Sequence, residues 1–285
     1  MHSLPFLVSL PCAALLAPAL MRSLSDAGHT RPNYRGRALP HPFGVLVLAA
    51  ALLALIPLTL VAQLGSSAVF YPIMLPIAVY ALGVLALGLI DDTLAREGAA
   101  ASPQAAPPQR GWRGHGAALL RGELSTGVLK AVGSLGLALL AMSYLGLSNG
   151  RWLLAAAVLV LATNVFNLLD LRPGRSTKVF VVLGAALALG STQLRTLWAL
   201  GLFAGPALVA GVYDLRERAM LGDTGANLLG ALAGLWLVLT LSGTEQLIAL
   251  VLLAGITLYG EIRSISALVE RTPGLRQLDS WGRPS

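Results

Sequence analysis

The sequence predicts an all-α fold, a polytopic integral membrane helix bundle of about nine transmembrane helices. The first observation is composition: 56% of the residues are hydrophobic and only 12% are charged, whereas about a quarter of a soluble domain is charged. The second is that the charges separate long uncharged segments, each near the length of about 20 residues that crosses a bilayer. The third is that almost all Lys and Arg residues fall in alternate loops.

Charged residues mark the boundaries of the expected spans. The first segment has no basic residue ahead of its apolar part, so we interpret it as a membrane helix and not as a cleaved signal peptide. The uncharged stretch 38–90 is too long for one crossing and is divided into two. The short segment 179–190 is expected to begin earlier, at Ser176. The expected spans are 1–21, 43–63, 70–90, 127–147, 152–169, 179–190, 197–213, 223–241 and 246–262.

The connections predict a single domain over residues 1–285. The low-complexity stretch 100–109 predicts a flexible loop over about 96–115, and the tail, about 263–285, has no apolar run long enough to cross again. Many glycines favour close helix packing, with GxxxG spacing at Gly201/Gly205 and Gly230/Gly234. The single cysteine excludes an internal disulfide and a cysteine metal cluster.

The basic residues predict the orientation. If the nine spans alternate, only Arg151 and Arg195 of the 20 Lys and Arg residues fall on one side. The positive-inside rule then puts the other loops and the C-terminal tail in the cytoplasm, with the N-terminus outside. This asymmetry explains the net charge of +7, so we expect no nucleic acid as a partner. Bases in the tail would meet membrane lipids with anionic head groups.

Two adjacent carboxylates follow the third span. Asp91 and Asp92 stand at the expected cytoplasmic end of this helix, where they repel each other and the negative end of the helix dipole. Either water solvates them or a cation lies beside them. That cation would be a metal ion or a base such as Arg96 or Arg113.

Three polar residues share one face of the fifth span. Asn164, Asn167 and Asp170 in NVFNLLD are each three residues apart, so successive side chains on a helix rotate by only about 60°. Their oxygens suit a hard cation, and the amide groups suit phosphate or sugar oxygens. Hydrogen bonding between helices is the structural alternative, above all for Asn164.

A third acidic position opens the eighth span, in the motif LGDTGAN. Asp223 is placed to cap this helix, with the flexible Gly222 and Gly225 beside it. Capping would leave a carboxylate oxygen for a metal ion, so the two roles are compatible.

Basic residues lie near these acids in the sequence. Lys130 stands just inside the fourth span, where a lysine must snorkel or find a partner. Arg175 and Lys178 follow Asp170 and are candidates for binding phosphate, although the positive-inside rule explains them equally well. His115, in RGHG, is a further candidate.

Together these residues predict one site at the cytoplasmic membrane surface. Carboxylates without cysteine are wrong for zinc and right for magnesium that is shared with a diphosphate. Phosphoryl transfer needs such a site, because a metal ion and cations neutralise the developing charge while a carboxylate positions or deprotonates the nucleophile.

In their order and spacing, Asp91-Asp92, NVFNLLD and LGDTGA resemble the motifs of the polyprenyl-phosphate N-acetylhexosamine-1-phosphate transferases. That family includes the phospho-N-acetylmuramoyl-pentapeptide translocase of cell-wall synthesis and the enzymes that attach GlcNAc-1-phosphate to undecaprenyl phosphate. The resemblance covers roughly residues 83–234. It implies a multi-pass enzyme of a bacterial-type cytoplasmic membrane, with the active site facing the cytoplasm.

The resemblance implies a glycosyl-1-phosphate transferase that depends on Mg²⁺, with Mn²⁺ as a substitute. The phosphate of a polyprenyl carrier would attack the β-phosphorus of a UDP-N-acetylamino sugar and release UMP, in peptidoglycan or another surface-glycan pathway. The implied metal residues are Asp223, Asn167 and Asp92. The implied catalytic residues are Asp91, Asp92, Asp170 and Lys130. The candidates for substrate binding are Asn164, Asn167, Asp170, Arg175, Lys178 and His115.

Some residues depart from the translocase pattern. Leu171, Arg172 and Pro173 follow Asp170 where that enzyme has a glycine and a further acidic residue. The resemblance therefore leaves the sugar open, and it also leaves open whether the protein forms a homodimer.

Two other classes of membrane protein share some of these features. CDP-alcohol phosphotransferases also use aspartates and a metal in the membrane, but their D-G-x-x-A-R pattern is absent and the chain has no Asp-Gly pair. A membrane transporter or lipid flippase would use Asn164, Asn167 and Asp170 near the bilayer midplane. Their position at the expected cytoplasmic edge counts against this alternative.

Overall fold

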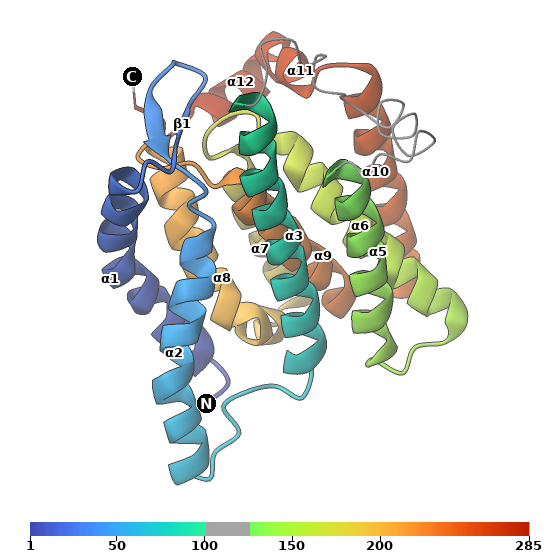
Figure 1. The fold of residues 1–285 in the computed structure, drawn as a ribbon. Coiled ribbons are helices and arrows are strands. Elements are labelled where there is room, and N and C mark those ends of the chain that lie inside the picture. Colours follow the sequence, from blue (N-terminus) through green and yellow to red (C-terminus); the bar gives the residue numbers. More distant parts are fainter. Residues whose placement is uncertain (101–125, 285) are drawn as a thin grey trace.

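The computed structural model describes residues 1–100 and 126–284, with side chains for 1–94 and 126–284 (Figure 1). The long helices are α1 (Leu4–Asp26), α2 (Val45–Leu64), α3 (Met74–Ala100), α5 (Thr126–Ser143), α6 (Asn149–Leu169), α7 (Arg175–Ser191), α8 (Arg195–Leu215), α9 (Gly222–Thr240) and α10 (Gly243–Ile262). The tail forms the short helices α11 (Ile265–Arg271) and α12 (Pro273–Ser280). Strands β1 (Thr30–Pro32) and β2 (Ala38–Pro40) form an antiparallel hairpin, with Thr30 paired to Pro40.

The all-α prediction is confirmed. The length and apolar composition of the helices indicate a multi-pass membrane protein. In the part of the chain that the structure describes, each expected span matches one long helix, and eight of these helices are long and apolar enough to cross a membrane. The exception is α7, which at 17 residues is the shortest of the long helices and stands at the lower limit of the length that crosses a membrane. The sequence did not predict the hairpin. Nine crossings and their orientation stay predictions.

Helix ends differ from the expected boundaries in two places. α7 begins at Arg175, one residue before the expected Ser176. α3 continues to Ala100, so the helix enters the segment 96–115 that the sequence predicts as a loop. The rest of that segment, including the candidate His115, lies outside the described residues.

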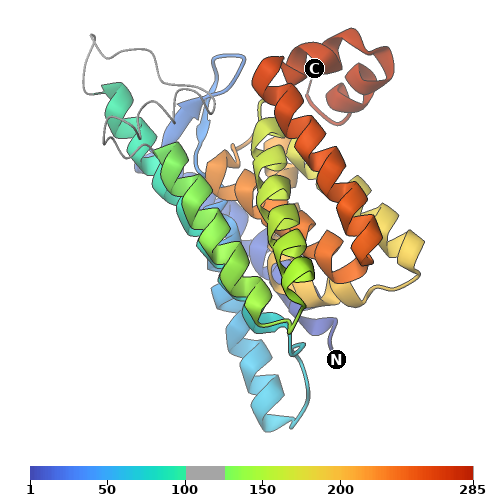
Figure 2. The same cartoon turned by 90° about the vertical axis from the view of Figure 1, so that its right-hand side faces the viewer.

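One end of the bundle gathers the acidic motifs. α3 and α6 end there and α9 begins there, and we call this the acidic end. Figures 1 and 2 show the hairpin and the tail helices at the same end, opposite the N-terminus.

α9 is the central helix of the bundle. It packs against α3, α6, α7 and α8, and 89% of the residues in its apolar stretch are buried. Small residues make this packing possible: a Cβ atom added to Gly230 would lie 2.6 Å from the Cα atom of Thr163 in α6. Gly201 likewise lies against α1, where a Cβ would be 2.7 Å from that of Phe6. Both GxxxG pairs therefore serve helix packing, as the sequence predicts.

Gly88 allows α3 to approach the start of α9. A Cβ atom at this buried glycine would lie only 2.7 Å from the Cα atom of Thr224. A backbone atom cannot move aside as a flexible side chain can, so any side chain at Gly88 would push the two helices apart. This contact sets the separation between Asp91-Asp92 on α3 and Asp223 on α9.

Gly88→Ala should therefore destabilise the protein by about 1–3 kcal/mol, as overpacking of a tight contact does. The measurement is thermal unfolding in detergent. Gly136→Ala on α5 is the matched control, because a Cβ atom there would meet nothing within 4 Å. Equal melting temperatures for the two variants would contradict this account of the α3–α9 contact.

Candidate functional site

Asp92, on α3, caps the N-terminus of α9. Its Oδ1 accepts a hydrogen bond from the backbone N–H of Asp223 (3.0 Å), and its Oδ2 accepts from the N–H (2.8 Å) and hydroxyl (2.7 Å) of Thr224. The Nε2 atom of His41 lies 3.3 Å from Oδ1. These contacts occupy both oxygens of a buried carboxylate, so the geometry favours a positioning role for Asp92 over the metal-binding and catalytic roles expected from the sequence.

The expectation that Asp223 caps α9 is wrong. The helix begins at Gly222, so Asp223 lies in its first turn, and no side chain of the local segment caps it. A Cβ atom on Gly222 would lie 2.6 Å from Oδ2 of Asp92, and this glycine has a φ of +70°, which residues with a side chain rarely adopt. Because the cap comes from Asp92, the carboxylate of Asp223 is left for other partners.

Lys130, on α5, joins two of the acidic motifs. Its Nζ atom lies 3.0 Å from Oδ2 of Asp91 and also forms an ion pair with Oδ2 of Asp223. All three side chains are less than a third exposed. A lysine inside a membrane span must either snorkel to the surface or find a partner, and Lys130 has partners. Arg113, expected as a counter-charge, is outside the described residues, as is the side chain of Arg96.

Asp170 adds a further carboxyl group at the acidic end. It follows α6, and the hydroxyl of Ser176 donates to its Oδ1 at 3.4 Å. Burial raises the pKa of Asp170 well above its usual value, and the negative charges of Asp214 and Asp223 raise it further. The structure therefore brings this carboxylate within electrostatic range of the other acids, and a bound cation would be stabilised there.

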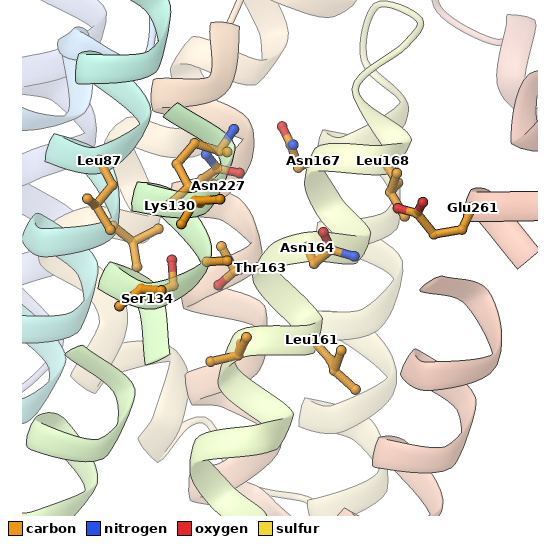
Figure 3. Close-up of a pocket in the computed structure, with 16 residues that line it drawn as sticks. Leu87, Lys130, Ser134, Leu161, Thr163, Asn164, Asn167, Leu168, Asn227 and Glu261 are labelled. Carbon is orange, nitrogen blue, oxygen red and sulfur yellow. The ribbon is translucent and has the colours of Figure 1, made fainter. Parts of the chain in front are cut away.

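A cavity of about 530 Å³ opens beside Lys130, between α3, α5, α6, α9 and α10. Figure 3 shows Lys130 and Asn227 on one side of it and Asn167 on the other. The lining farther from the acidic end is mostly apolar and includes Val132 and Val160. The cavity is thus polar next to the acids and apolar deeper in the bundle.

The two asparagines of NVFNLLD have different environments. Asn164 donates from Nδ2 to the hydroxyl of Thr257 in α10, at 3.2 Å, which is the bond between helices that the structural alternative predicts. Asn167 lines the cavity, and within the described side chains it makes no hydrogen bond through its carboxamide. Asn167 is therefore the better candidate for contact with a ligand.

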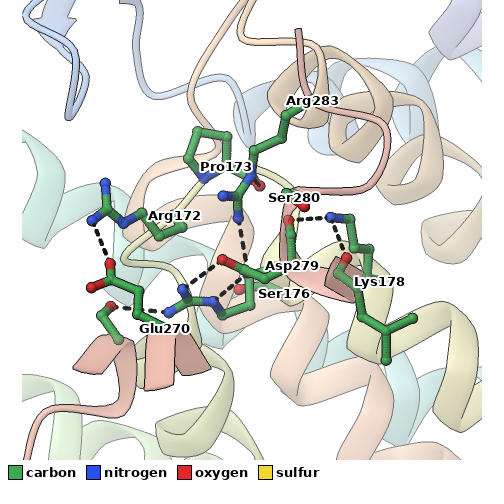
Figure 4. A network of polar contacts seen from close by, with 12 residues as sticks. Arg172, Pro173, Ser176, Lys178, Glu270, Asp279, Ser280 and Arg283 are labelled. Carbon is green, nitrogen blue, oxygen red and sulfur yellow. Dashed lines mark hydrogen bonds and ion pairs between the residues drawn. The ribbon is translucent and has the colours of Figure 1, made fainter. Parts of the chain in front are cut away.

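Two of the expected substrate-binding residues face the C-terminal tail. Arg175 binds both carboxylate oxygens of Asp279, at 2.8 and 3.0 Å, and Lys178 donates to the backbone carbonyl groups of Leu278 and Asp279 (Figure 4). Neither residue lines the cavity. The geometry therefore does not support a role for Arg175 and Lys178 in binding the substrate directly.

Sequence reasoning did not select His41, Asp214 or Asn227. Buried Asp214 accepts from the N–H groups of Gly174 (2.6 Å) and Leu221 (3.3 Å), so it braces the loops before α7 and α9. Neither His41 nor Asp214 has a local pattern that reveals such distant partners. Asn227 does have one, because it follows Asp223 by four residues and so lies on the same helix face.

The donor set fits a magnesium ion that is shared with a substrate. Within residues 1–94 and 126–284, no three His, Cys, Asp or Glu side chains are arranged to hold a metal ion. Mg²⁺ often takes only one or two carboxylates and completes its shell with water and substrate phosphates. Asp223 and Asn167 supply suitable oxygens, and the Lys130 ammonium between Asp91 and Asp223 shows that these carboxylates accommodate a cation.

Comparison with known proteins adds nothing to these motifs: no family model matches the chain, and no curated protein matches it.

Asp170→Asn should stabilise the protein at neutral pH. Because the pKa of Asp170 is raised in the folded state, that state binds more protons than the unfolded chain above about pH 4, and stability falls as the pH rises. The variant has no carboxyl group at this position, so its stability should not fall for this reason. The difference in melting temperature between Asp170→Asn and wild type should therefore grow between pH 4 and pH 8. Asp26→Asn, at an exposed position, is the control. Parallel pH profiles for wild type and Asp170→Asn would contradict the effect of burial.

Proposed function

We propose that the protein is a glycosyl-1-phosphate transferase that moves a phospho-N-acetylamino sugar from a UDP-sugar to a polyprenyl phosphate and releases UMP. The observation that carries this proposal is the meeting of Asp91, Lys130 and Asp223 from three helices beside the cavity. The three ordered motifs that resemble this family supply two of these residues. Their convergence is what a phosphoryl-transfer site requires.

The shape of the cavity supports a lipid acceptor. Its polar part, with Lys130, Asn167 and Asn227, is suited to phosphate and sugar groups. Its deeper part, lined by residues such as Val132 and Val160, is suited to an isoprenoid chain that enters from the bilayer. An acceptor with a charged head and an apolar chain would match both parts at once.

Each residue has a role in the proposed reaction. Asp91 orients the acceptor phosphate and takes a proton from it when that phosphate is protonated. The phosphate oxygen then bonds to the β-phosphorus, and the bond between this phosphorus and the oxygen bridging to the α-phosphate breaks. Lys130 neutralises charge on the departing UMP. Mg²⁺, held by Asp223 and Asn167, would supply further charge neutralisation at the diphosphate.

This function requires the acidic end to face the cytoplasm, where UDP-sugars are available. The positive-inside rule predicts that orientation. The protein would then act at the inner face of a cytoplasmic membrane, on a carrier that reaches the site by lateral diffusion in the bilayer.

The test is release of UMP from UDP-GlcNAc or UDP-MurNAc-pentapeptide, by purified protein supplied with undecaprenyl phosphate and Mg²⁺. Asp91→Asn and Asp223→Asn should each lower the rate by roughly 100-fold or more, because each removes a charge placed at the reacting groups. Asp26→Asn, exposed at the end of α1, should match wild type.

Two results would contradict the proposal. One is wild-type protein that releases no UMP from any UDP-sugar tested. The other is an Asp223→Asn variant as active as wild type. Substrate flux through proteoliposomes without UMP release would instead favour the transporter alternative.

A further inference from the structure

The C-terminal tail is fastened to the loop between α6 and α7. Arg172 donates to Glu270 of α11 at 2.9 Å, and Arg283 donates from Nε to the carbonyl oxygen of Pro173, also at 2.9 Å. Arg175, where α7 begins, binds Asp279 through two hydrogen bonds. Figure 4 shows these contacts converging from the tail on one short segment. We call Arg175, Asp279 and Arg283 the tail clamp.

The tail clamp is buried, unlike most surface ion pairs. The side chains of Arg175, Arg283 and Asp279 are 5%, 10% and 12% exposed, whereas Glu270 is 55% exposed. Burial alone would raise the pKa of Asp279, but the hydrogen bonds and charges of the two arginines hold it below its usual value. Removing one member of a buried charge cluster is costly, whereas an exposed pair contributes little. The clamp is therefore the most buried set of ion pairs between the tail and the 171–175 loop, and Lys178 adds two hydrogen bonds to the same part of the tail.

The loop held by the clamp is the one that places Asp170. Directly before Arg175, the N–H group of Gly174 donates to Asp214. Directly after it, the hydroxyl of Ser176 shares its one proton between the carbonyl oxygen of Phe166 (3.2 Å) and Oδ1 of Asp170 (3.4 Å), both at the end of α6. The tail and the loop also share a packing partner: Gly282 of the tail and Gly174 of the loop both lie against the side chain of Leu215. A shift of Arg175 would therefore move Ser176 and the first turn of α7, and with them the hydrogen bond to Asp170.

We propose that Asp279 and Arg283 of the tail are positioning residues, which hold the 171–175 loop so that Asp170 keeps its place at the acidic end. They act through Arg175 and Ser176 and touch no part of the cavity. The role in catalysis rests on the proposed transferase function. The ordering of the loop does not rest on it, so the two can be tested apart.

The first measurement is hydrogen–deuterium exchange of the backbone in residues 171–178, in the full-length protein. Asp279→Asn should speed exchange there by about tenfold or more, since it breaks a buried charge pair. Arg283→Gln, which leaves the Arg175–Asp279 pair, should give a smaller increase, and Asp279→Glu should restore much of the protection. Glu270→Gln is the matched control, because it removes an exposed pair between the same tail and the same loop.

The second measurement is UMP release by the same variants. Asp279→Asn should lower kcat/KM by about tenfold, and in the double variant with Asp170→Asn it should cause almost no further loss, because residues that act through one group are not additive. Glu270→Gln should stay near wild type.

Each outcome decides the proposal. Unchanged exchange in both Asp279→Asn and Arg283→Gln would overturn it. So would faster exchange with unchanged kcat/KM, or a full tenfold loss on the Asp170→Asn background. If wild type releases no UMP, the proposed function fails and the catalytic role of the clamp falls with it. The exchange data would still show whether the tail orders the loop.

Discussion

The acidic end depends on one interaction, the carboxylate of Asp92 at the N-terminus of α9. The first N–H groups of a helix have no partner within the helix, and in a membrane protein no bulk water reaches them when they are buried. Asp92 satisfies those of Asp223 and Thr224 from a neighbouring helix, which Gly88 allows to come close enough. An anion at this position is worth up to about 2 kcal/mol in a partly buried setting. It also fixes where the side chain of Asp223 stands.

Once Asp92 is bound in this way, the charge balance of the remaining acids decides what the site can do. Lys130 is one ammonium shared by Asp91 and Asp223, and Asp170 lies in range of the same negative field. The excess of carboxylates opposes folding and favours a cation, which is the usual compromise at a functional site. A structural network would gain stability by having fewer acids. The excess is therefore better explained by a bound cation, which is the part that Mg²⁺ would have in the proposed reaction.

The tail shows how the protein fixes a loop outside the apolar core. Within the bundle, close packing of small residues sets helix positions, as at Gly230 against α6. In the 171–175 loop, Gly174 lies against Leu215 and the guanidinium of Arg172 lies over the ring of Tyr34, and the backbone groups of the loop need hydrogen bonds. Arginine suits this task because its planar group binds a carboxylate in two places at once. Arg175, which the sequence offered as a candidate for binding phosphate, is thus bound by the chain itself.

The sequence by itself determined the helical membrane class, the apolar segments and the helix that carries Asn164 and Asn167; α6 ends at Leu169, so Asp170 lies just beyond the face that the spacing predicts for all three. Length, hydropathy and helical spacing are local properties, and they need no knowledge of what lies opposite. Only the tertiary structure decided that Lys130 and not Arg175 meets the acids, that Asp92 and not Asp223 caps α9, and that Asn164 binds α10. Partners of buried polar groups come from helices distant in the chain, so their identity depends on how helices pack and in what register, which no local pattern records.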